Sequence, residues 1–475
     1  MRNDYEIVIG LEIHVELKTE SKIFCSCSTE FGAAPNTLCC PVCMGLPGAL
    51  PTLNEKAAEY AVKAGLALNC DISERSAFDR KNYFYPDLPK AYQITQFFEP
   101  ICRGGYVEID TDNEKKRIGI TEIHLEEDAG KLCHSEKGTA IDFNRCGVPL
   151  IEIVTEPHMR SADEAKAFLQ KLRLLLLYTG ISDCKMNEGS LRCDVNLSVR
   201  RHGQTEYGTR TEMKNINSFA FVKKAIEYEA QRQIDALERG ERIVQETRRF
   251  DSQSGKTYSM RSKEDSCDYR YFPEPDLPAL IVTKGKIEKL RRELPRLPDT
   301  RKADYKKYYS LGEYESDVLT SGIALADYFE ECAKETEHRR TLANLILGEL
   351  LSLQTSEDFK CNIAPKNLAK LSDLLGSARI NSSTAKRLLR EMYASDFDPE
   401  EAVIERSLLQ INDKETLTKL VRQAIKENPK AAEDYRRGKL SAAKTIVGRV
   451  IKQTEGRANP TLTNEITEME LRSKL

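Results

Sequence analysis

Alternating hydrophobic and polar positions mark the beginning of the chain. From residue 5 to residue 17 the odd positions are apolar or aromatic, while Glu12, His14 and Glu16 occupy even positions. A period of two over this length predicts a β-strand with one face in a core and the other face open. On that open face Glu12 and His14 are close enough to share one hard cation. The alternative is a solvated strand edge whose charges have no joint role.

Three later segments, 148–157, 191–200 and 211–219, combine apolar positions with charged or amide side chains in the same way. These polar positions are Glu152, Arg192, Asp194, Asn196, Glu212 and Lys214. Strands of this design predict a mostly antiparallel open sheet whose inner face rests on helices and whose outer face is a polar concavity. The expected fold class is therefore α+β, with a cradle-like sheet.

Helical spacing predicts the covering helices. They are expected at about 54–68, after a capping box formed by Ser161 and Glu164, and at about 218–238. Gly180 stands where the C-terminal cap of the second helix belongs. This sheet-and-helix domain is predicted to span residues 1–294.

The rest of the chain has helical spacing throughout. Segment 295–302 contains two prolines and is interpreted as a linker. An all-α domain is predicted for residues 295–406, and a small helical tail domain for residues 407–475. The helices are expected at about 315–334, 338–354, 365–376, 383–393, 413–427 and 440–453. A chain of 475 residues exceeds what one core usually holds, which agrees with two to three domains.

The charge balance suggests a class of binding partner only at the C-terminal end of the chain. The net charge of the chain is -3, which indicates no class of partner. From residue 407 onward 14 Lys and Arg face 9 Asp and Glu, a surplus of +5 that leaves -8 for the remainder. The predicted final helix carries four cations that form either a solvated face or an RNA-facing stripe. They are Lys439, Lys444, Arg449 and Lys452.

No apolar run is long enough for a membrane span, and no signal peptide is visible, so we expect a cytoplasmic protein without membrane contact. Fourteen cysteines in that compartment favour thiols and metal ligands over disulfides. Cys25 and Cys27 form one close pair, and Cys40 and Cys43 form a second pair in the loop 25–43. Two such pairs predict a tetrahedral zinc site, and the alternative is a set of free or buried thiols.

Segment 78–97 mixes cations with aromatic residues and lacks helical periodicity. It contains Arg80, Lys81, Tyr83, Phe84, Tyr85, Lys90 and Tyr92. Lysines offer point charges for phosphate, and aromatic rings offer stacking faces, so we expect a binding loop rather than a packed surface loop. The chain has no phosphate-binding loop, no dinucleotide fingerprint and no nucleophile elbow. Any nucleotide phosphates must therefore be held by metal and by Lys or Arg.

Long ordered motifs carry a resemblance to one family. They include IGLEIHVEL, the two cysteine pairs, FDRKNYFYPDLPKAYQI, HLEEDAGK, PLIEIVTEP, GSLRCDVNLS, EMKNINSF and DYRYFPEPDLP, and they cover about residues 5–280. In these motifs the chain closely resembles the B subunits of the tRNA-dependent amidotransferases, which act on the aspartyl or glutamyl group of misacylated tRNA(Asn) or tRNA(Gln).

The resemblance implies a subunit of an ATP-dependent carbon–nitrogen ligase with glutamine as amido donor. Such a subunit would use ATP to phosphorylate the side-chain carboxylate of Glu-tRNA(Gln) or Asp-tRNA(Asn). Ammonia from an amidase-type A subunit would then displace the phosphate, and a small C subunit would complete a heterotrimer. Two other interpretations remain: a zinc-containing RNA-binding protein without catalysis, and a metal-dependent phosphoesterase.

The resemblance also implies roles for residues. It makes Glu12, His14, Glu127 and Glu152 the magnesium ligands, with Glu126 as the rival of Glu127 because the sequence EED permits a slip of one. Lys81, Lys90 and Arg192 would contact phosphate or carboxylate groups. Zinc would be structural, held by the four cysteines, and the tail would grip the outer part of the tRNA.

Overall fold

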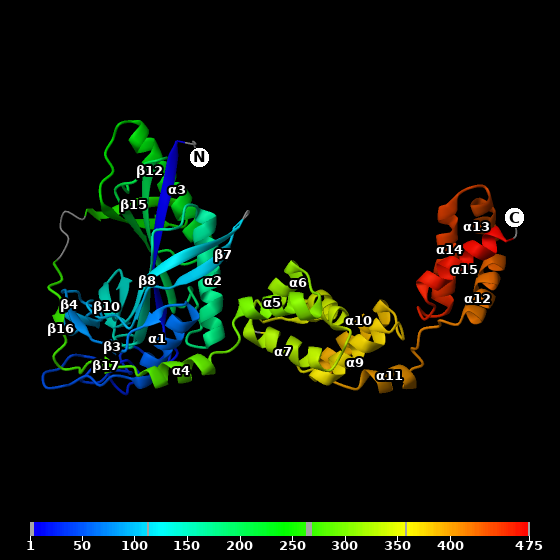
Figure 1. Cartoon of the computed structure of the whole chain (residues 1–475), viewed down its shortest axis with the longest axis horizontal. Coiled ribbons are helices and arrows are strands. Elements are labelled where there is room, and N and C mark those ends of the chain that lie inside the picture. Colours follow the sequence, from blue (N-terminus) through cyan, green and yellow to red (C-terminus); the bar gives the residue numbers. More distant parts are fainter. Residues whose placement is uncertain (1–3, 112–113, 263–267, 357–358, 474–475) are drawn as a thin grey trace. The chain divides into compact units, whose positions relative to one another are not determined.

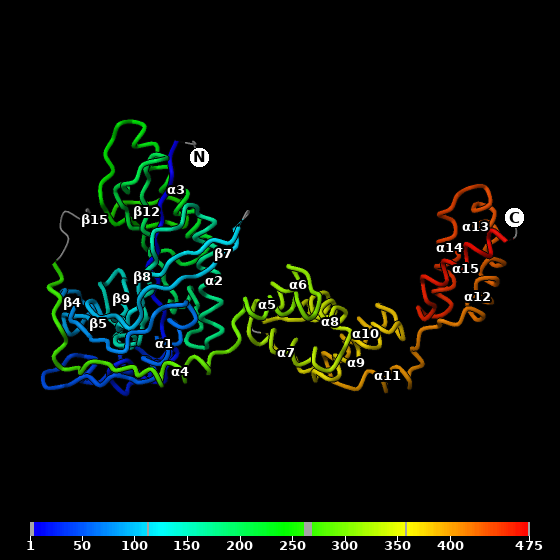
Figure 2. The backbone as a smooth tube through the Cα atoms, in the orientation of Figure 1, coloured from blue at the N-terminus to red at the C-terminus, as the bar shows by residue number. Residues whose placement is uncertain are grey.

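The computed structural model describes residues 4–111, 114–262, 268–356 and 359–473. The chain divides into two compact units, residues 1–297 and residues 298–475, and each is described by itself. Figures 1 and 2 trace both units along the chain.

The first unit is built around a ten-stranded sheet. Its strands are β1 (Tyr5–Glu16), β2 (Asp71–Ile72), β6 (Cys102–Arg103), β7 (Tyr106–Asp110), β8 (Lys115–Glu127), β11 (Pro149–Thr155), β12 (Leu191–Arg201), β13 (Thr211–Lys214), β14 (Glu246–Asp251) and β15 (Lys256–Ser262). Neighbours follow the order β15-β14-β13-β12-β1-β11-β8-β6-β2, and β7 pairs with β8. Among the described strands of this sheet only β13 and β14 pair in parallel. The predicted mostly antiparallel sheet is confirmed.

Shorter strands form small sheets separate from the large one. They are β3 (Arg75–Ser76), β4 (Asp79–Asn82), β5 (Tyr92–Thr95), β9 (Lys131–Ser135), β10 (Gly138–Asp142), β16 (Phe272–Pro273) and β17 (Leu280–Ile281). The small sheets have the orders β10-β9, β16-β4-β5 and β17-β3. β16 pairs with β4, and β17 pairs with β3. Segment 272–281 therefore lies along strands formed some 200 residues earlier in the chain, as Figure 2 shows.

The helices in the described part of the first unit are α1 (Glu55–Ala67), α2 (Ala162–Thr179), α3 (Phe219–Glu238) and α4 (Lys284–Glu293). The backbone N–H of Glu164 donates to Ser161 Oγ at 3.0 Å, and Gly180 adopts φ +70° at the C-terminal cap of α2. The odd residues of β1, from Ile7 to Val15, are buried in one core together with apolar residues of α1, α2 and α3. The even residues from 12 to 16 are only half-buried, as the alternating pattern predicted.

The second unit is helical. Its first part contains α5 (Pro298–Tyr309), α6 (Glu313–Leu319), α7 (Ile323–Lys334), α8 (Arg339–Leu345), the π-helical turn η2 (Ile346–Leu350), the 3₁₀ turn η3 (Leu351–Leu353), α9 (Pro365–Gly376), α10 (Ser382–Ala394) and α11 (Pro399–Glu405). Because α5 begins at Pro298, most of segment 295–302 is helix. The boundary between the two units nevertheless falls inside this predicted linker, after residue 297. The helix predicted at 315–334 is interrupted before Gly322, which starts α7 as its N-cap.

The last part of the chain has its own small core. It contains α12 (Lys414–Glu427), α13 (Pro429–Arg436), the 3₁₀ turn η4 (Leu440–Ala442), α14 (Ala443–Gln453) and α15 (Pro460–Arg472). The sequence did not predict α13 or α15, both of which begin at a proline in the first helical position. An α+β part followed by helical parts is confirmed. Across the described ranges, no helix combines the length and the apolar character that a membrane span requires.

Candidate active site

Strand β1 runs through the middle of the candidate active site. Its antiparallel register sets His14 opposite Glu152 on β11 and opposite Arg192 on β12. Glu152 in turn stands opposite His124 on β8. Directly opposed residues of neighbouring strands project to the same face of a sheet. These four side chains therefore form one row across the half-exposed face.

Three side chains near this row come within ligand distance of one another. His14 Nε2 lies 3.3 Å from Glu126 Oε1 and 3.3 Å from Glu152 Oε2. All three ligand atoms lie within 4.8 Å of one another. An imidazole and two carboxylates are a donor set that divalent cations accept. We call this group, His14, Glu126 and Glu152, site 1.

The charges in site 1 depend on burial and on its neighbours. Burial lowers the pKa of the His124 imidazole, but neighbouring carboxylates, Glu152 foremost, outweigh burial and raise it to about 10. Burial raises the pKa of Glu152, but the imidazoles of His124 and His14 hold it well below its usual range. The pKa of Glu126 is raised by burial and by the Glu152 charge. Glu152 is thus the carboxylate that stays ionised in this group.

A second group of acids lies where β1, β12 and β13 adjoin. Glu12, Asp194 and Glu212 each place one carboxylate oxygen within 4.8 Å of the others. We call these three residues site 2. Lys214 Nζ lies 3.0 Å from Glu212 Oε1 and forms an ion pair with Asp194. Asn196 Nδ2 donates to Glu12 Oε1 at 2.8 Å, while its buried Oδ1 has no partner among the described residues. The three convergent carboxylates are an all-oxygen donor set of the kind that Mg²⁺ prefers.

Glu127 lies apart from both groups. Its carboxylate Oε1 is 2.5 Å from Lys90 Nζ and also accepts the backbone N–H of Ile94 at 2.9 Å. Consecutive residues of a strand point to opposite faces. Of the two glutamates that the sequence left open, the structure therefore brings Glu126, and not Glu127, to His14.

Two of the three predicted cations flank the acids. Burial lowers the pKa of Lys81 on β4, but the charges of Glu126 and Glu152 outweigh it and raise this pKa, so Lys81 is a cation beside site 1. Arg192 on β12 stands in the row described above. Lys90 is bound to Glu127 on the other face, and the structure does not bring it to either site.

Arg192 also forms part of a large cavity. Arg192 Nη2 lies 2.8 Å from Asp128 Oδ2, while the buried Nε has no partner among the described residues. The cavity has a volume of about 700 Å³, and its lining includes Asp194 of site 2 together with the loop residues 29–33 and 186–189. A volume of this size is typical of small-molecule sites.

Glu16 lies in the lining of this cavity and beside Asp128. Burial and the Asp128 charge raise the pKa of Glu16 to about 8. The unfolded chain releases this proton near pH 4.3, so stability contributed by the protonated group is lost as pH rises from roughly 4 to 8. We expect Glu16→Gln, which cannot ionise, to reduce this loss by up to about 1.4 kcal/mol per pH unit. Urea unfolding at several pH values in this window measures the effect, and an identical pH dependence in both proteins would contradict it.

The four predicted zinc ligands lie together. One Sγ from each of Cys25, Cys27, Cys40 and Cys43 lies within 4.8 Å of the others. A hydrogen bond from the Cys25 thiol is the main cause that lowers the pKa of Cys43 to about 4, and Lys22 Nζ, 3.6 Å from Cys43 Sγ, acts in the same direction. A hydrogen bond with Cys43 raises the pKa of Cys25, and burial raises the pKa of Cys27 to about 11, so Cys43 is the sulfur of this group that favours thiolate. Four sulfurs that converge in this way are the donor set of a structural zinc site.

Removing one of these sulfurs should release the metal. We expect Cys40→Ser to hold much less zinc than the unaltered chain and to unfold at a lower temperature, because three sulfurs bind zinc less tightly than four. Cys39→Ser is the matched control, since Cys39 Sγ lies 3.8 Å from Asn144 Oδ1 and outside the four-sulfur group. Elemental analysis and a thermal scan measure both effects. Equal zinc content in the two variants would rule out this metal site.

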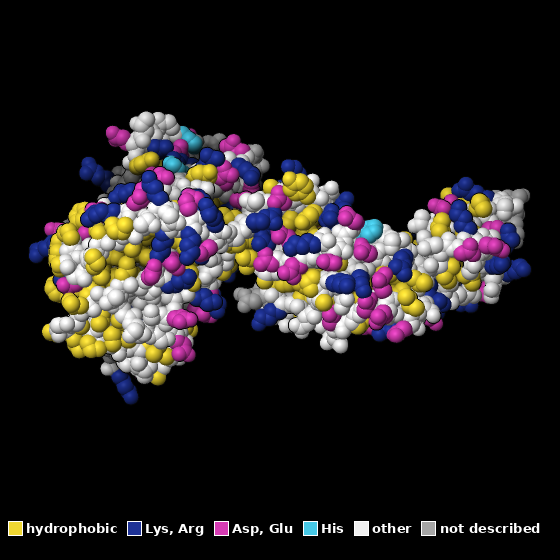
Figure 3. Space-filling model, turned by 60° about the horizontal axis from the view of Figure 1, so that its bottom comes forward, with side chains coloured by type: hydrophobic (Ala, Val, Ile, Leu, Met, Phe, Trp, Pro, Cys, Tyr) yellow, Lys and Arg dark blue, Asp and Glu magenta, His cyan; other side chains and the backbone are white. Residues whose placement is uncertain are grey.

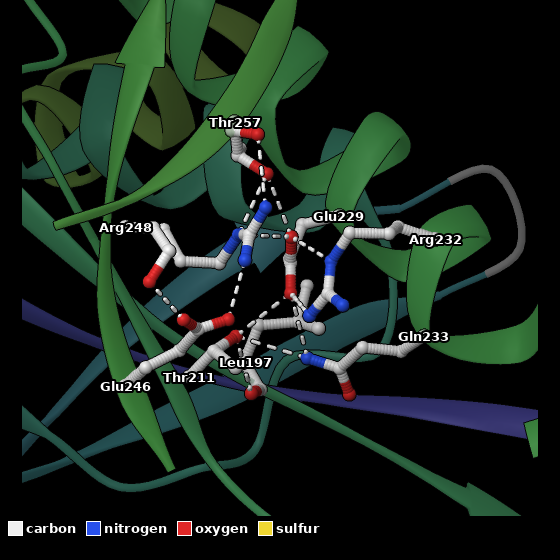
Figure 4. Close-up of polar contacts among 9 residues, drawn as sticks. Leu197, Thr211, Glu229, Arg232, Gln233, Glu246, Arg248 and Thr257 are labelled. Carbon is white, nitrogen blue, oxygen red and sulfur yellow. Dashed lines mark hydrogen bonds and ion pairs between the residues drawn. The ribbon is translucent and has the colours of Figure 1, made fainter. Parts of the chain in front are cut away.

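A buried polar network joins β13, the strand that contributes Glu212 to site 2, to α3, β14 and β15 (Figure 4). Its centre is Glu229 on α3, a fully buried carboxylate. Glu229 contacts side chains of α3, β13, β14 and β15, which are Arg232 at 2.6 Å, Gln233 at 3.0 Å, Thr211 at 3.1 Å, Arg248 at 3.2 Å and Thr257 at 2.8 Å. Thr211 directly precedes Glu212, whose Oε2 accepts from Thr247 Oγ1 at 2.9 Å. One helix carboxylate thereby fixes the strands around Glu212.

Sequence reasoning noted some residues of site 2 without giving them a role. The alternating pattern was the only sequence signal for these residues, because it placed Asp194, Asn196 and Glu212 on the polar faces of predicted strands. Asp128 and Glu229 had no such signal, because Asp128 follows a strand and Glu229 lies inside a helix. The structure also separates Glu12 from His14, which the sequence had assigned to one ion, and puts them in neighbouring groups.

Comparison with known proteins identifies the family of the chain. The family described as "GatB/GatE catalytic domain" matches residues 7–288, and the family described as "GatB domain" matches residues 327–471. The first family match includes every residue of sites 1 and 2.

Curated relatives match over nearly the whole chain. The B subunit of the aspartyl/glutamyl-tRNA(Asn/Gln) amidotransferase of Caldicellulosiruptor saccharolyticus is 56% identical over 98% of this chain and 99% of its own length. The proteins of the same name from Carboxydothermus hydrogenoformans and Thermodesulfovibrio yellowstonii are 52% and 51% identical, over 99% and 97% of this chain and 99% and 98% of their own lengths. The chain therefore belongs to the family of the B subunits of the aspartyl/glutamyl-tRNA(Asn/Gln) amidotransferase.

Proposed function

We propose that this chain activates the side-chain carboxylate of Glu-tRNA(Gln) or Asp-tRNA(Asn) by phosphorylation with ATP. The observation that carries this proposal is the placement of two candidate cation sites side by side on one sheet face, flanked by Lys81 and Arg192. Phosphoryl transfer needs little covalent chemistry from a protein, but it needs closely placed positive charge and alignment. Both donor sets fit Mg²⁺, which would neutralise phosphate charge and align the reacting groups when bound.

The chain's own residues have separate tasks in this proposal. Site 1 and site 2 would hold the cations, with Glu126 in the place that the sequence gave first to Glu127. Lys81 attracts the substrate carboxylate or the phosphates at the edge of site 1. Arg192, with an unpartnered Nε beside the cavity of about 700 Å³, binds the nucleotide phosphates.

The reaction then has two balanced steps. A carboxylate oxygen of the aminoacyl side chain bonds to the γ-phosphorus of ATP, and the bond to the leaving ADP breaks. Ammonia next attacks the activated acyl carbon, phosphate leaves, and the nitrogen loses a proton to give the amide. The first step raises the reactivity of a carboxylate that ammonia would not otherwise attack.

Ammonia comes from outside this chain in the proposal. An amidase-type A subunit would release it from glutamine, and a small C subunit would complete the heterotrimer. The four cysteines of the loop 25–43 lie in one cluster and are better suited to structural zinc than to glutamine hydrolysis. We place the reaction in the cytoplasm, where translation uses its product.

The tail supplies a candidate contact to tRNA. All four cations predicted for this role, Lys439, Lys444, Arg449 and Lys452, are exposed. Arg449 Nε lies 3.2 Å from Glu427 Oε2, so its charge is partly balanced within the domain. The other three are the stronger candidates for phosphate contacts.

Reconstitution tests the proposal. The chain is combined with its A and C partners, each misacylated tRNA is supplied in turn, and amide formation is followed with and without ATP. The expected result is conversion that requires ATP and misacylated tRNA together. Phosphodiester cleavage without ATP would favour a phosphoesterase, and tRNA binding with neither reaction would favour a binding protein without catalysis.

A further inference from the structure

A continuous series of aromatic rings leads from the surface of the first unit to site 1. Neighbouring ring centroids are 5.0 Å apart between Phe98 and Phe97, 4.0 Å between Phe97 and Tyr271, 6.0 Å between Tyr271 and Tyr269, and 5.9 Å between Tyr269 and Tyr83. We call these five residues the aromatic track. They come from segments 83–98 and 269–271, which are far apart in the sequence and meet where β16 pairs with β4.

The outer end of the track is open to solvent. Phe97 is 51% exposed and Phe98 is 53% exposed. Figure 3 shows hydrophobic side chains gathered over the part of the first unit where β4 and β16 lie in Figure 1. Large rings rarely stay exposed side by side without a binding role.

The inner end of the track reaches the candidate chemistry. Lys81 Nζ lies 5.1 Å from the centroid of the Tyr269 ring and 6.0 Å from that of Tyr83. The same ammonium interacts with the charges of Glu126 and Glu152 in site 1. The rings therefore connect open solvent with the place of the proposed phosphoryl transfer.

Polar contacts hold the track in place. The backbone N–H groups of Phe97 and Phe98 donate to Asp79 Oδ2 at 2.8 and 3.0 Å. Asn82 Nδ2 donates to the carbonyl oxygen of Arg270 at 2.8 Å, which fixes the segment between the two tyrosines. A rigid platform loses little conformational entropy on binding.

We infer that the aromatic track stacks the unpaired 3′-terminal nucleotides of the aminoacyl-tRNA and guides its aminoacyl end to site 1. This inference rests on the proposed function for the identity of the RNA. Stacking on successive rings suits single-stranded nucleotides, because every base has an aromatic face. Two exposed cations adjoin the track and suit the phosphate backbone: Arg270, between the two tyrosines, and Arg103 on β6, whose Nη2 donates to the carbonyl oxygen of Phe98 at 2.8 Å. A protein partner bound at the surface would contact only the exposed rings, and it would not account for the rings that continue inward to Lys81.

The test uses the full chain and a tRNA whose terminal adenine is replaced by the fluorescent base 2-aminopurine. Stacking quenches this fluorescence, so we expect quenching with the unaltered chain and much weaker quenching with Phe97→Leu and Phe98→Leu. Affinity for the intact tRNA should fall about five- to tenfold in each variant, whereas affinity for the same tRNA without its unpaired 3′ end should not change. Tyr314→Leu, which removes an exposed ring of α6 in the other unit, is the matched control and should behave like the unaltered chain.

Two results would overturn the inference. One is unchanged quenching and affinity in both phenylalanine variants. The other is loss of a co-purifying partner protein in these variants with tRNA binding intact, which would make the track a protein contact. Because the assay contains no ATP, its failure leaves the proposed phosphorylation standing. If the tRNA fluorescence were quenched as expected but the reconstituted enzyme showed no ATP-dependent reaction, the aromatic track would still be supported and the proposed function would be refuted.

Discussion

Replacing Glu152 by glutamine is expected to lower ATP-dependent amide formation by at least about a hundredfold. Glu152 lies 3.3 Å from His14 Nε2 and is the carboxylate of site 1 that its neighbours keep ionised. Glutamine preserves the shape of the side chain but removes the charge that a divalent cation requires. The rate of amide formation and the binding of Mn²⁺ to the chain, followed by electron paramagnetic resonance, measure the two consequences separately.

A charged residue away from the acids provides the control. Glu108→Gln on β7 removes a carboxylate whose ion pair with Arg117 is largely exposed, and it should leave both measurements unchanged. If Glu152→Gln retained full activity and Mn²⁺ binding, site 1 would not hold the metal, and the proposed mechanism would fail.

Replacing Glu229 by leucine is expected to lower the free energy of unfolding of the first unit by about 3–5 kcal/mol. The side chain is fully buried, and its loss leaves the guanidinium of Arg248 and the hydroxyls of Thr211 and Thr257 without their shared acceptor. Unpaired buried polar groups cost far more than an exposed pair contributes. Chemical denaturation, followed by a probe in the first unit, measures the change.

An exposed ion pair serves as the comparison for Glu229. Glu241 and Arg239 form such a pair just after α3, and Glu241→Gln should not change stability measurably. Equal stability of the Glu229 and Glu241 variants would show that the buried network is not what holds α3 to its strands.

The sequence predicted much of the first unit for a simple physical reason. The alternation in β1 identifies its polar face, and the caps at Ser161 and Gly180 identify the ends of α2, because both signals are local. Boundaries inside the helical unit were less well predicted. Pro298 looked like a linker residue, but it occupies the first turn of a helix, where its missing N–H has no cost.

The candidate site was only partly accessible to sequence reasoning. The choice between Glu126 and Glu127 depends on which of them points toward β1, and the register with β11 decides this. The division of Glu12 and His14 between two groups depends on Asp194 and Glu212, which come from strands about 180 and 200 residues later in the chain.

By itself, then, the sequence determined which side chains share a polar face and which cysteines are spaced to meet, since periodicity and spacing act over a few residues. Only the tertiary structure decided which of those faces adjoin, that Glu126 joins His14, and that rings from segments 83–98 and 269–271 form one track. The physical reason is that pairing between distant strands is set by how their buried faces pack in a common core, and no local pattern records that register.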